Sequence, residues 1–171
     1  MKVVGLGSVK KMSALVPGEL VSLQARGKPC LAVCISNDGP LAELVLLSGL
    51  EQSVGWKVRP ESHRECYSYG LDWILDFSSS EHFYPDQMRN GEPPQFILDE
   101  DGLKLSFMID DYRGVGFWDV YKKEMIDRWP MSAVILQEYS IWQSEAAMDR
   151  PDAKPLFVKE APAASDQGLT P

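Results

Sequence analysis

Histidine and cysteine are scarce in this sequence, which has two histidines and three cysteines among its 171 residues. Two histidines cannot form a histidine-rich metal centre. The cysteines (Cys30, Cys34 and Cys66) are odd in number and form no C-x-x-C pair, so they do not predict a disulfide framework. We expect three buried, reduced thiols and no bound metal.

Long apolar runs are also missing. No stretch of about 18 apolar residues occurs, and the sequence therefore offers no candidate for a membrane-spanning helix. The N-terminal segment lacks the continuous apolar core of a signal peptide, because Gly5, Gly7, Lys10 and Lys11 interrupt it. We expect a protein of the cytoplasm with no membrane partner.

Positive charge is under-represented: 17 Lys and Arg face 25 Asp and Glu, which gives a formal net charge of −8. Because an acidic surface repels phosphate backbones, this balance argues against nucleic acid as a partner. One local basic segment (Lys57, Arg59, His63, Arg64) leaves a nucleic-acid-binding barrel as a remaining alternative. The same acidic surface favours encounter with a basic protein.

Apolar residues make up 44% and charged residues 25% of the chain, a composition typical of a globular domain. We expect one β-rich domain over residues 15–143, a flexible N-terminal arm over 1–14 and a largely disordered tail over 144–171. The tail is rich in Ala, Pro and Asp, so it buries too little apolar surface to offset its ordering entropy. Its residues 156–158 (Leu-Phe-Val) are the exception, as a candidate short edge strand.

Strict alternation of apolar and polar residues predicts a strand at 103–110, with the sequence LKLSFMID. Residues 95–99 precede it across a turn that ends at Gly102, where glycine supplies the positive φ of a tight hairpin. A second turn at 110–114 leads to a short strand at 115–119. Together these segments predict an antiparallel meander.

The first third of the chain follows the same pattern. Strands are predicted at 19–25, 29–35 and 41–48, separated by turns at 26–27 and 37–40. The middle strand is apolar on both faces, which suits a central strand covered on both sides. A curled meander of this kind often closes into a small barrel, and in strand order alone it is similar to SH3-like folds.

Alternation also predicts a strand at 71–77, whose apolar face holds Leu71, Trp73, Leu75 and Phe77. The residues that follow lack periodicity as far as residue 94 and predict a long loop. Loops of this length inside a compact domain are often functional.

One principal helix is predicted at 120–129, because Asp119 is a suitable N-cap and because apolar side chains recur at four-residue steps (Tyr121, Met125, Trp129). The predicted fold class is thus α+β and mainly antiparallel β. It combines a barrel-like, SH3-like N-terminal sheet with a second hairpin meander, this helix and a disordered C-terminal tail.

Two motif-like segments fail on their spacing. Residues 5–7 (Gly-Leu-Gly) resemble the start of a dinucleotide-binding turn, but Lys10 stands where the third small residue is needed. The acidic turn at 99–102 resembles a calcium loop, but its alignment puts Ile97 and Met108 at ligand positions. Neither segment predicts a cofactor, and we expect none.

Catalysis remains an alternative, in the form of a small hydrolase with a scattered site. Cys66 and His63 are a candidate nucleophile and base, although on a strand they would face opposite sides. Carboxylates near aromatic residues are the candidates for acid catalysis: Asp72, Asp76, Asp110 and Asp111. No spacing selects among these groups, so no catalytic residue is predicted.

A cluster of aromatic residues and one arginine supports the functional hypothesis. Phe117 and Trp118 are adjacent in a short strand, so one of them is expected to be exposed or to cover a second layer. With Tyr112 and Arg113 on the preceding turn, they resemble the clusters enriched at interaction hot spots; the alternative is a second hydrophobic core. The sequence favours a non-enzymatic binding module that acts through protein–protein contact or self-association. A neutralising protein of the immunity or antitoxin type, directed at a basic partner, is the alternative within that class.

Overall fold

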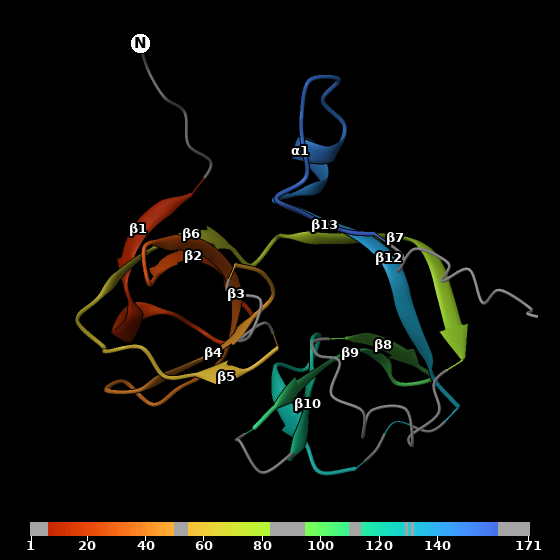
Figure 1. The fold of residues 1–171 in the computed structure, drawn as a ribbon, viewed down its shortest axis with the longest axis horizontal. Coiled ribbons are helices and arrows are strands. Elements are labelled where there is room, and N and C mark those ends of the chain that lie inside the picture. The colour runs from red at the N-terminus through yellow and green to blue at the C-terminus, as the bar shows by residue number, and fades with distance from the viewer. Residues whose placement is uncertain are drawn as a thin grey trace, which may run out of the picture.

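The computed structural model of the chain describes residues 7–49, 55–82, 95–109, 114–128, 130 and 132–160. Nearly all regular structure in these residues belongs to two antiparallel sheets, which lie side by side (Figure 1). The first sheet is drawn in red to yellow and the second in green to blue. The mainly antiparallel β architecture predicted from alternation and turn chemistry is confirmed.

The first sheet has the strand order β1-β6-β2-β3-β4-β5. The predicted three-stranded meander is confirmed, since β2, β3 and β4 pair consecutively. Arg26 and Gly27 both adopt positive φ, of 50° and 77°, as a two-residue hairpin turn requires. The strands are β1 (Ser8–Lys11), β2 (Leu20–Ala25), β3 (Lys28–Asn37), β4 (Ala42–Leu46), β5 (Lys57–Val58) and β6 (Glu65–Gly70).

This first sheet is not a closed barrel. Within the described residues its two outermost strands, β1 and β5, do not pair with each other. β6 does return beside β2, but the two strands pair only from Leu20 to Ser22 on the β2 side. Beyond Ser22 they separate, and β5 is only two residues long, so the sheet curls without closing.

The second sheet follows the order β11-β10-β9-β8-β12-β13, with β7 paired to the other edge of β12. The predicted meander is confirmed in β8, β9 and β10, which pair consecutively. The strand β12 is central, because both of its edges are paired. β7 pairs along one edge, and β8 and β13 pair with different parts of the other. The strands are β7 (Ile74–His82), β8 (Phe96–Asp99), β9 (Gly102–Met108), β10 (Val115–Asp119), β11 (Glu124–Ile126), β12 (Val134–Trp142) and β13 (Phe157–Lys159).

The helix predicted at 120–129 is wrong. In its place the chain turns and forms β11, which pairs with β10. Asp119 does accept hydrogen bonds from the two amides that an N-cap would satisfy, but Lys123 has φ 59° and reverses the chain. Tyr121 and Met125 are 72% and 45% exposed, so their four-residue spacing did not indicate a buried helical face. In the described residues the α-helical structure is a single turn, α1 (Glu145–Met148).

The two ends of the described chain are more structured than their composition indicates. Residues 8–14, expected to be part of a flexible arm, form β1 and the 3₁₀ turn η1 (Met12–Ala14). An ion pair of Lys10 with the buried Glu19 anchors this segment, and Ser68 Oγ donates to Glu19 Oε1 at 3.0 Å. At the other end, the predicted edge strand at 156–158 is present as β13.

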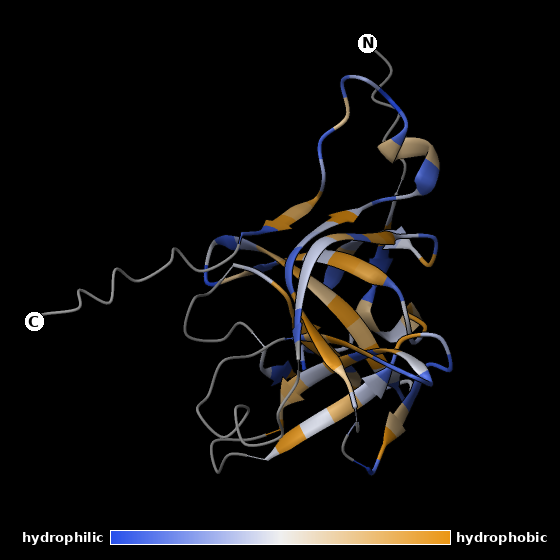
Figure 2. Cartoon of the chain, turned by 90° about the vertical axis from the view of Figure 1, so that its right-hand side faces the viewer, coloured by the Kyte–Doolittle hydropathy of each residue, from blue (hydrophilic) through white to orange (hydrophobic). Residues whose placement is uncertain are grey.

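The hydrophobic core connects both sheets, and Figure 2 shows the apolar residues gathered along their strands. The strand β3 is buried on both faces, as predicted. One face contributes to a cluster shared with the second sheet, and the other to a cluster inside the first sheet. These alternate residues of β3 are Leu31, Val33 and Ile35 on the shared side, and Cys30, Ala32 and Cys34 on the inner side.

Candidate functional site

An apolar groove of about 340 Å³ opens where the turn at residues 17–18, the start of β7 and the β8–β9 hairpin approach the turn after β10. These segments are far apart in the sequence, so the groove exists only in the folded chain. Its lining residues are Gly18, Leu71, Trp73, Ile74, Leu75, Phe77, Leu98, Leu103, Val120, Tyr121 and Lys123.

The floor of the groove is continuous with the shared core. Trp73, Leu75, Leu98 and Val120 pack against that core cluster, and Leu103 belongs to it. Trp73 is fixed further, because its indole Nε1 donates to the carbonyl oxygen of Gly18 at 2.9 Å. A floor held in this way is already formed before any partner arrives.

The rim of the groove exposes large apolar side chains. Leu71 is 43% exposed, Phe77 47% and Tyr121 72%. Single exposed apolar residues are ordinary on protein surfaces, but three around one apolar hollow are a feature of interaction sites. This exposure on a preformed floor makes the groove the candidate site.

One wall of the groove is the turn that joins β10 to β11. The Asp119 carboxylate holds this turn, since Oδ1 accepts from the amides of Tyr121 at 3.0 Å and Lys122 at 2.8 Å. Its Oδ2 lies 3.0 Å from Nζ of the buried Lys104. Burial by itself raises the pKa of the Asp119 carboxyl, but the Lys122 amide and the Lys104 ammonium hold it below its usual value overall.

The same lysine, which lies on β9, also pairs with an acid at the end of β8. Lys104 Nζ lies 3.2 Å from Oδ1 of Asp99, and the side chains of both residues are buried. Asp99 in turn accepts a hydrogen bond from the amide of Asp101 at 2.9 Å. The acidic turn considered as a calcium loop is thus bound by a lysine of the chain itself. Among the described residues no group of three His, Cys, Asp or Glu side chains is placed to hold a metal ion.

The predicted aromatic–arginine patch is only partly described. Tyr112 and Arg113 lie outside the described residues. Phe117 and Trp118 do face opposite ways, as predicted, and both are buried, with 3% and 0% exposure. Phe117 belongs to a small cluster on the outer face of the second sheet and Trp118 to the shared core. Phe117 therefore covers a second layer, and neither ring is available at the surface.

Cys66 and His63 are not brought together in the structure. His63 is exposed and pairs with Glu61 at 3.5 Å, whereas the Cys66 thiol is buried and directed at the Lys10 carbonyl, 3.6 Å away. Burial and the nearby Glu19 raise the pKa of Cys66 to about 11, which disfavours the thiolate that a nucleophile needs.

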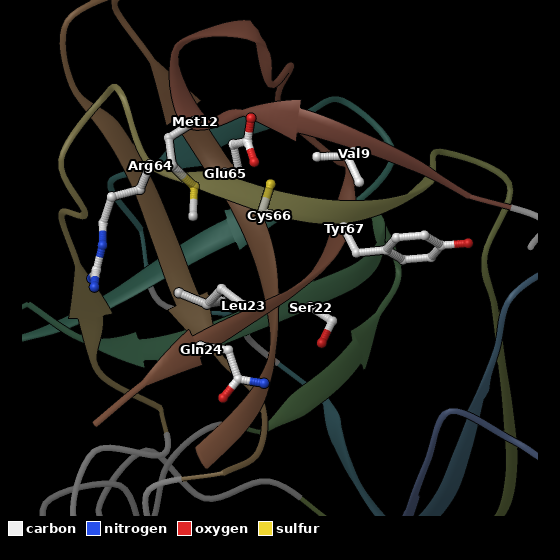
Figure 3. Close-up of a pocket in the computed structure, with 9 residues that line it drawn as sticks. All are labelled: Val9, Met12, Ser22, Leu23, Gln24, Arg64, Glu65, Cys66 and Tyr67. Carbon is white, nitrogen blue, oxygen red and sulfur yellow. The ribbon is translucent and has the colours of Figure 1, made fainter. Parts of the chain in front are cut away.

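Cys66 also lines a second hollow, of about 450 Å³, between the diverging strands β2 and β6. Figure 3 shows Met12, Leu23 and Cys66 near one another within it, while Arg64 and Tyr67 extend away in different directions. These three inner residues are almost fully buried, and one exposed large apolar residue, Val9, lines the hollow, whereas three lie around the groove. We refer to it as the β2–β6 hollow.

The carboxylates considered for acid catalysis are not gathered either. Asp72 and Asp76 are exposed on β7 and just before it, and Asp110 and Asp111 lie outside the described residues. The sequence did identify one side of the groove, because all four residues on the apolar face predicted at 71–77 line it. The opposite side comes from turns and a hairpin that only the tertiary fold brings to this face.

Within the described residues no helix has the length and apolar character needed to cross a bilayer. Comparison of the chain with protein-family models, with curated proteins and with solved structures finds no match in any of the three.

Proposed function

We propose that the protein is a binding module that takes an apolar segment of a partner protein into the groove beside β7. The observation that supports this proposal most strongly is the pairing of a rigid apolar floor with the exposed side chains of Leu71, Phe77 and Tyr121. Binding sites combine a preformed hydrophobic hollow with aromatic residues that a partner can cover.

The size and chemistry of the groove support a segment of a partner rather than a broad, flat contact. Its volume of about 340 Å³ is at the small end of the range for ligand sites. Among the described residues the lining includes one lysine and no carboxylate, so this lining does not provide the acidic surface that would attract a basic partner. A neutraliser of a basic protein is therefore not favoured by this site.

We further propose that the first sheet has an SH3-like organisation. The order β6-β2-β3-β4-β5 places β6, the last of these strands in the sequence, beside β2, the first strand of the meander. This arrangement supports an SH3-like organisation of the first sheet, to which β1 is added at the edge. The fold alone does not select a function.

The proposal is tested with peptides selected on the intact protein from a displayed random library. Dissociation constants are measured by fluorescence anisotropy for the wild type, Phe77→Ser and Val158→Ser. Val158 is the matched control, because it is 51% exposed against 47% for Phe77, and both residues lie on strands that pair with β12.

We expect Phe77→Ser to weaken binding by about tenfold or more, or ~1.4 kcal/mol, and Val158→Ser to leave it unchanged. Circular dichroism checks that both variants fold. Equal affinity of wild type and Phe77→Ser for every selected peptide would contradict the proposal. Sedimentation velocity of the same proteins measures whether self-association also depends on Phe77.

A further inference from the structure

Lys123 is the charged residue among those that line the groove. Neighbouring cations are neutralised: Lys104 pairs with Asp99 and Asp119, and Lys122 lies 3.9 Å from Asp119. No ion pair within the described part of the chain involves Lys123. Among the described residues, the groove therefore places an ammonium group without a carboxylate partner next to an apolar surface.

The backbone of Lys123 is held in place, and the aliphatic part of its exposed side chain lies against Gly18. Its amide donates to the Asp119 carbonyl at 2.8 Å, and its φ of 59° is set by the reversal of the turn. Its aliphatic part crosses Gly18 so closely that a Cβ on Gly18 would lie 3.1 Å from Cε and 3.3 Å from Cδ of Lys123. Because this aliphatic part already lies against the chain, the side chain loses less entropy on binding than a fully free lysine would.

We propose that Lys123 binds the terminal carboxylate of a partner chain whose last residue places an apolar side chain in the groove. This inference rests on the proposed function. A carboxylate accepts hydrogen bonds from an ammonium group and is its natural counterion, and in the part of the chain that the structure describes no acidic residue lines the groove to compete for it.

The geometry favours a chain end over an acidic side chain. In a terminal residue the carboxylate and the apolar side chain are attached to the same Cα, so both fall within one small hollow. In an extended segment, by contrast, the side chains of adjacent residues point to opposite sides. A partner that inserts an apolar side chain would then direct a neighbouring Asp or Glu away from Lys123.

The test uses a library displayed with free carboxyl termini and the intact protein. A selected peptide that ends in an apolar residue is synthesised with a free carboxylate, with a C-terminal amide, and as an amide with glutamate at the penultimate position. Each form is titrated against the wild type, Lys123→Gln, Lys122→Gln and Phe77→Ser. Lys122→Gln is the matched control, because it removes the same charge from a residue that does not line the groove.

We expect amidation to weaken binding to the wild type by about threefold or more, with no recovery from the penultimate glutamate. Lys123→Gln should weaken binding of the free acid by a similar factor and remove the effect of amidation, whereas Lys122→Gln should preserve it. The inference is overturned if the acid and the amide bind the wild type equally, or if the glutamate restores affinity. If the carboxylate inference fails in this way but Phe77→Ser still weakens binding, the proposed function stands. If no selected peptide depends on Phe77, the proposed function and the carboxylate inference both fail.

Discussion

Nζ of Lys104 lies 3.0 Å from Oδ2 of Asp119, with the side chains of both residues almost wholly buried. This pair connects the middle of β9 to the turn after β10, and that turn forms one wall of the groove. A buried ion pair does not by itself stabilise a protein more than apolar residues would, but loss of one partner leaves an uncompensated charge. Its role here is to fix the conformation of the turn.

Removal of one member of this pair is expected to be costly. Lys104→Met should lower the free energy of unfolding by about 3–5 kcal/mol, because it leaves the Asp119 and Asp99 carboxylates buried without their ammonium partner. Asp119→Asn should cost less, because Lys104 keeps its pair with Asp99. The double variant should lose less than the sum of the two single losses. Urea titration measures all three, and a strictly additive double variant would show that the two residues do not interact.

The exposed pair of Arg128 and Asp101 is the control for this experiment. Its side chains are 76% and 37% exposed, against 3% and 0% for Lys104 and Asp119. Arg128→Gln should change the free energy of unfolding by only about 0–1 kcal/mol, since solvent screens exposed ion pairs.

The same pair predicts a dependence of stability on acid. Since the pKa of Asp119 in the folded protein is below its usual value, its contribution is present above the unfolded pKa and is lost as pH falls through the folded pKa. We expect the free energy of unfolding to decrease as pH falls below about 4. Asp119→Asn should show a shallower decrease than the wild type over this range in urea titrations at successive pH values. An equal slope would contradict this assignment.

Gly18 is predicted to be sensitive to a single added methyl group. It has φ +95°, and a Cβ there would lie 3.1 Å from Lys123 Cε and 3.2 Å from Leu71 Cδ2. Gly18→Ala should therefore destabilise the protein by about 1–3 kcal/mol and weaken peptide binding. Gly27→Ala is the control, because Gly27 also has positive φ, +77°, but its Cβ would meet nothing within 4 Å.

Thermal unfolding and anisotropy separate the two effects. Gly27→Ala should lower the melting temperature through backbone strain alone and leave peptide affinity unchanged. Gly18→Ala should change both. If the two variants bound peptides equally well, the contact of Lys123 with Gly18 would not position the groove wall.

The buried thiols are expected to be unreactive in the folded protein. Burial, followed by the charge of Glu19, raises the pKa of Cys34 to about 12 and that of Cys66 to about 11. At pH 8 both remain protonated, and the thiol is a poor nucleophile. Iodoacetamide labelling followed by mass spectrometry should show slow modification of both residues in the native state and rapid modification in denaturant. Fast native labelling of Cys66 would indicate that the β2–β6 hollow opens.

The sequence predicted residue positions best where the side chains on one face of a strand form a continuous apolar surface. Alternation at 71–77 identified the four apolar residues that form one side of the groove, and the double-sided apolar run of β3 identified a strand buried on both faces. The inference on β3 needs only the two-residue period of a strand. The strand bounds predicted at 71–77 were partly wrong, because β7 begins at Ile74 and continues to His82, through residues 78–82 of the predicted loop. The cap role of Asp119 was also recognised, although the element that it caps is a turn.

The helix after Asp119 could not be excluded from the sequence, because its spacing and cap are typical of helices. The reversal at Lys123 depends on the pairing of β11 with β10 and on the buried Lys104, both of which are tertiary features. The groove itself was missed for the same reason. Its far wall and its lysine come from segments whose proximity to β7 is set by the sheet order, which a sequence pattern does not contain.

Hydrogen exchange with and without a selected peptide tests the central claim most directly. The groove account predicts that peptide binding slows amide exchange in residues 71–77 and 120–123. It predicts unchanged exchange in β13 and in the strands around the β2–β6 hollow. Slowed exchange confined to β2 and β6, with residues 71–77 unaffected, would show that the protein binds its partners elsewhere and would contradict the account.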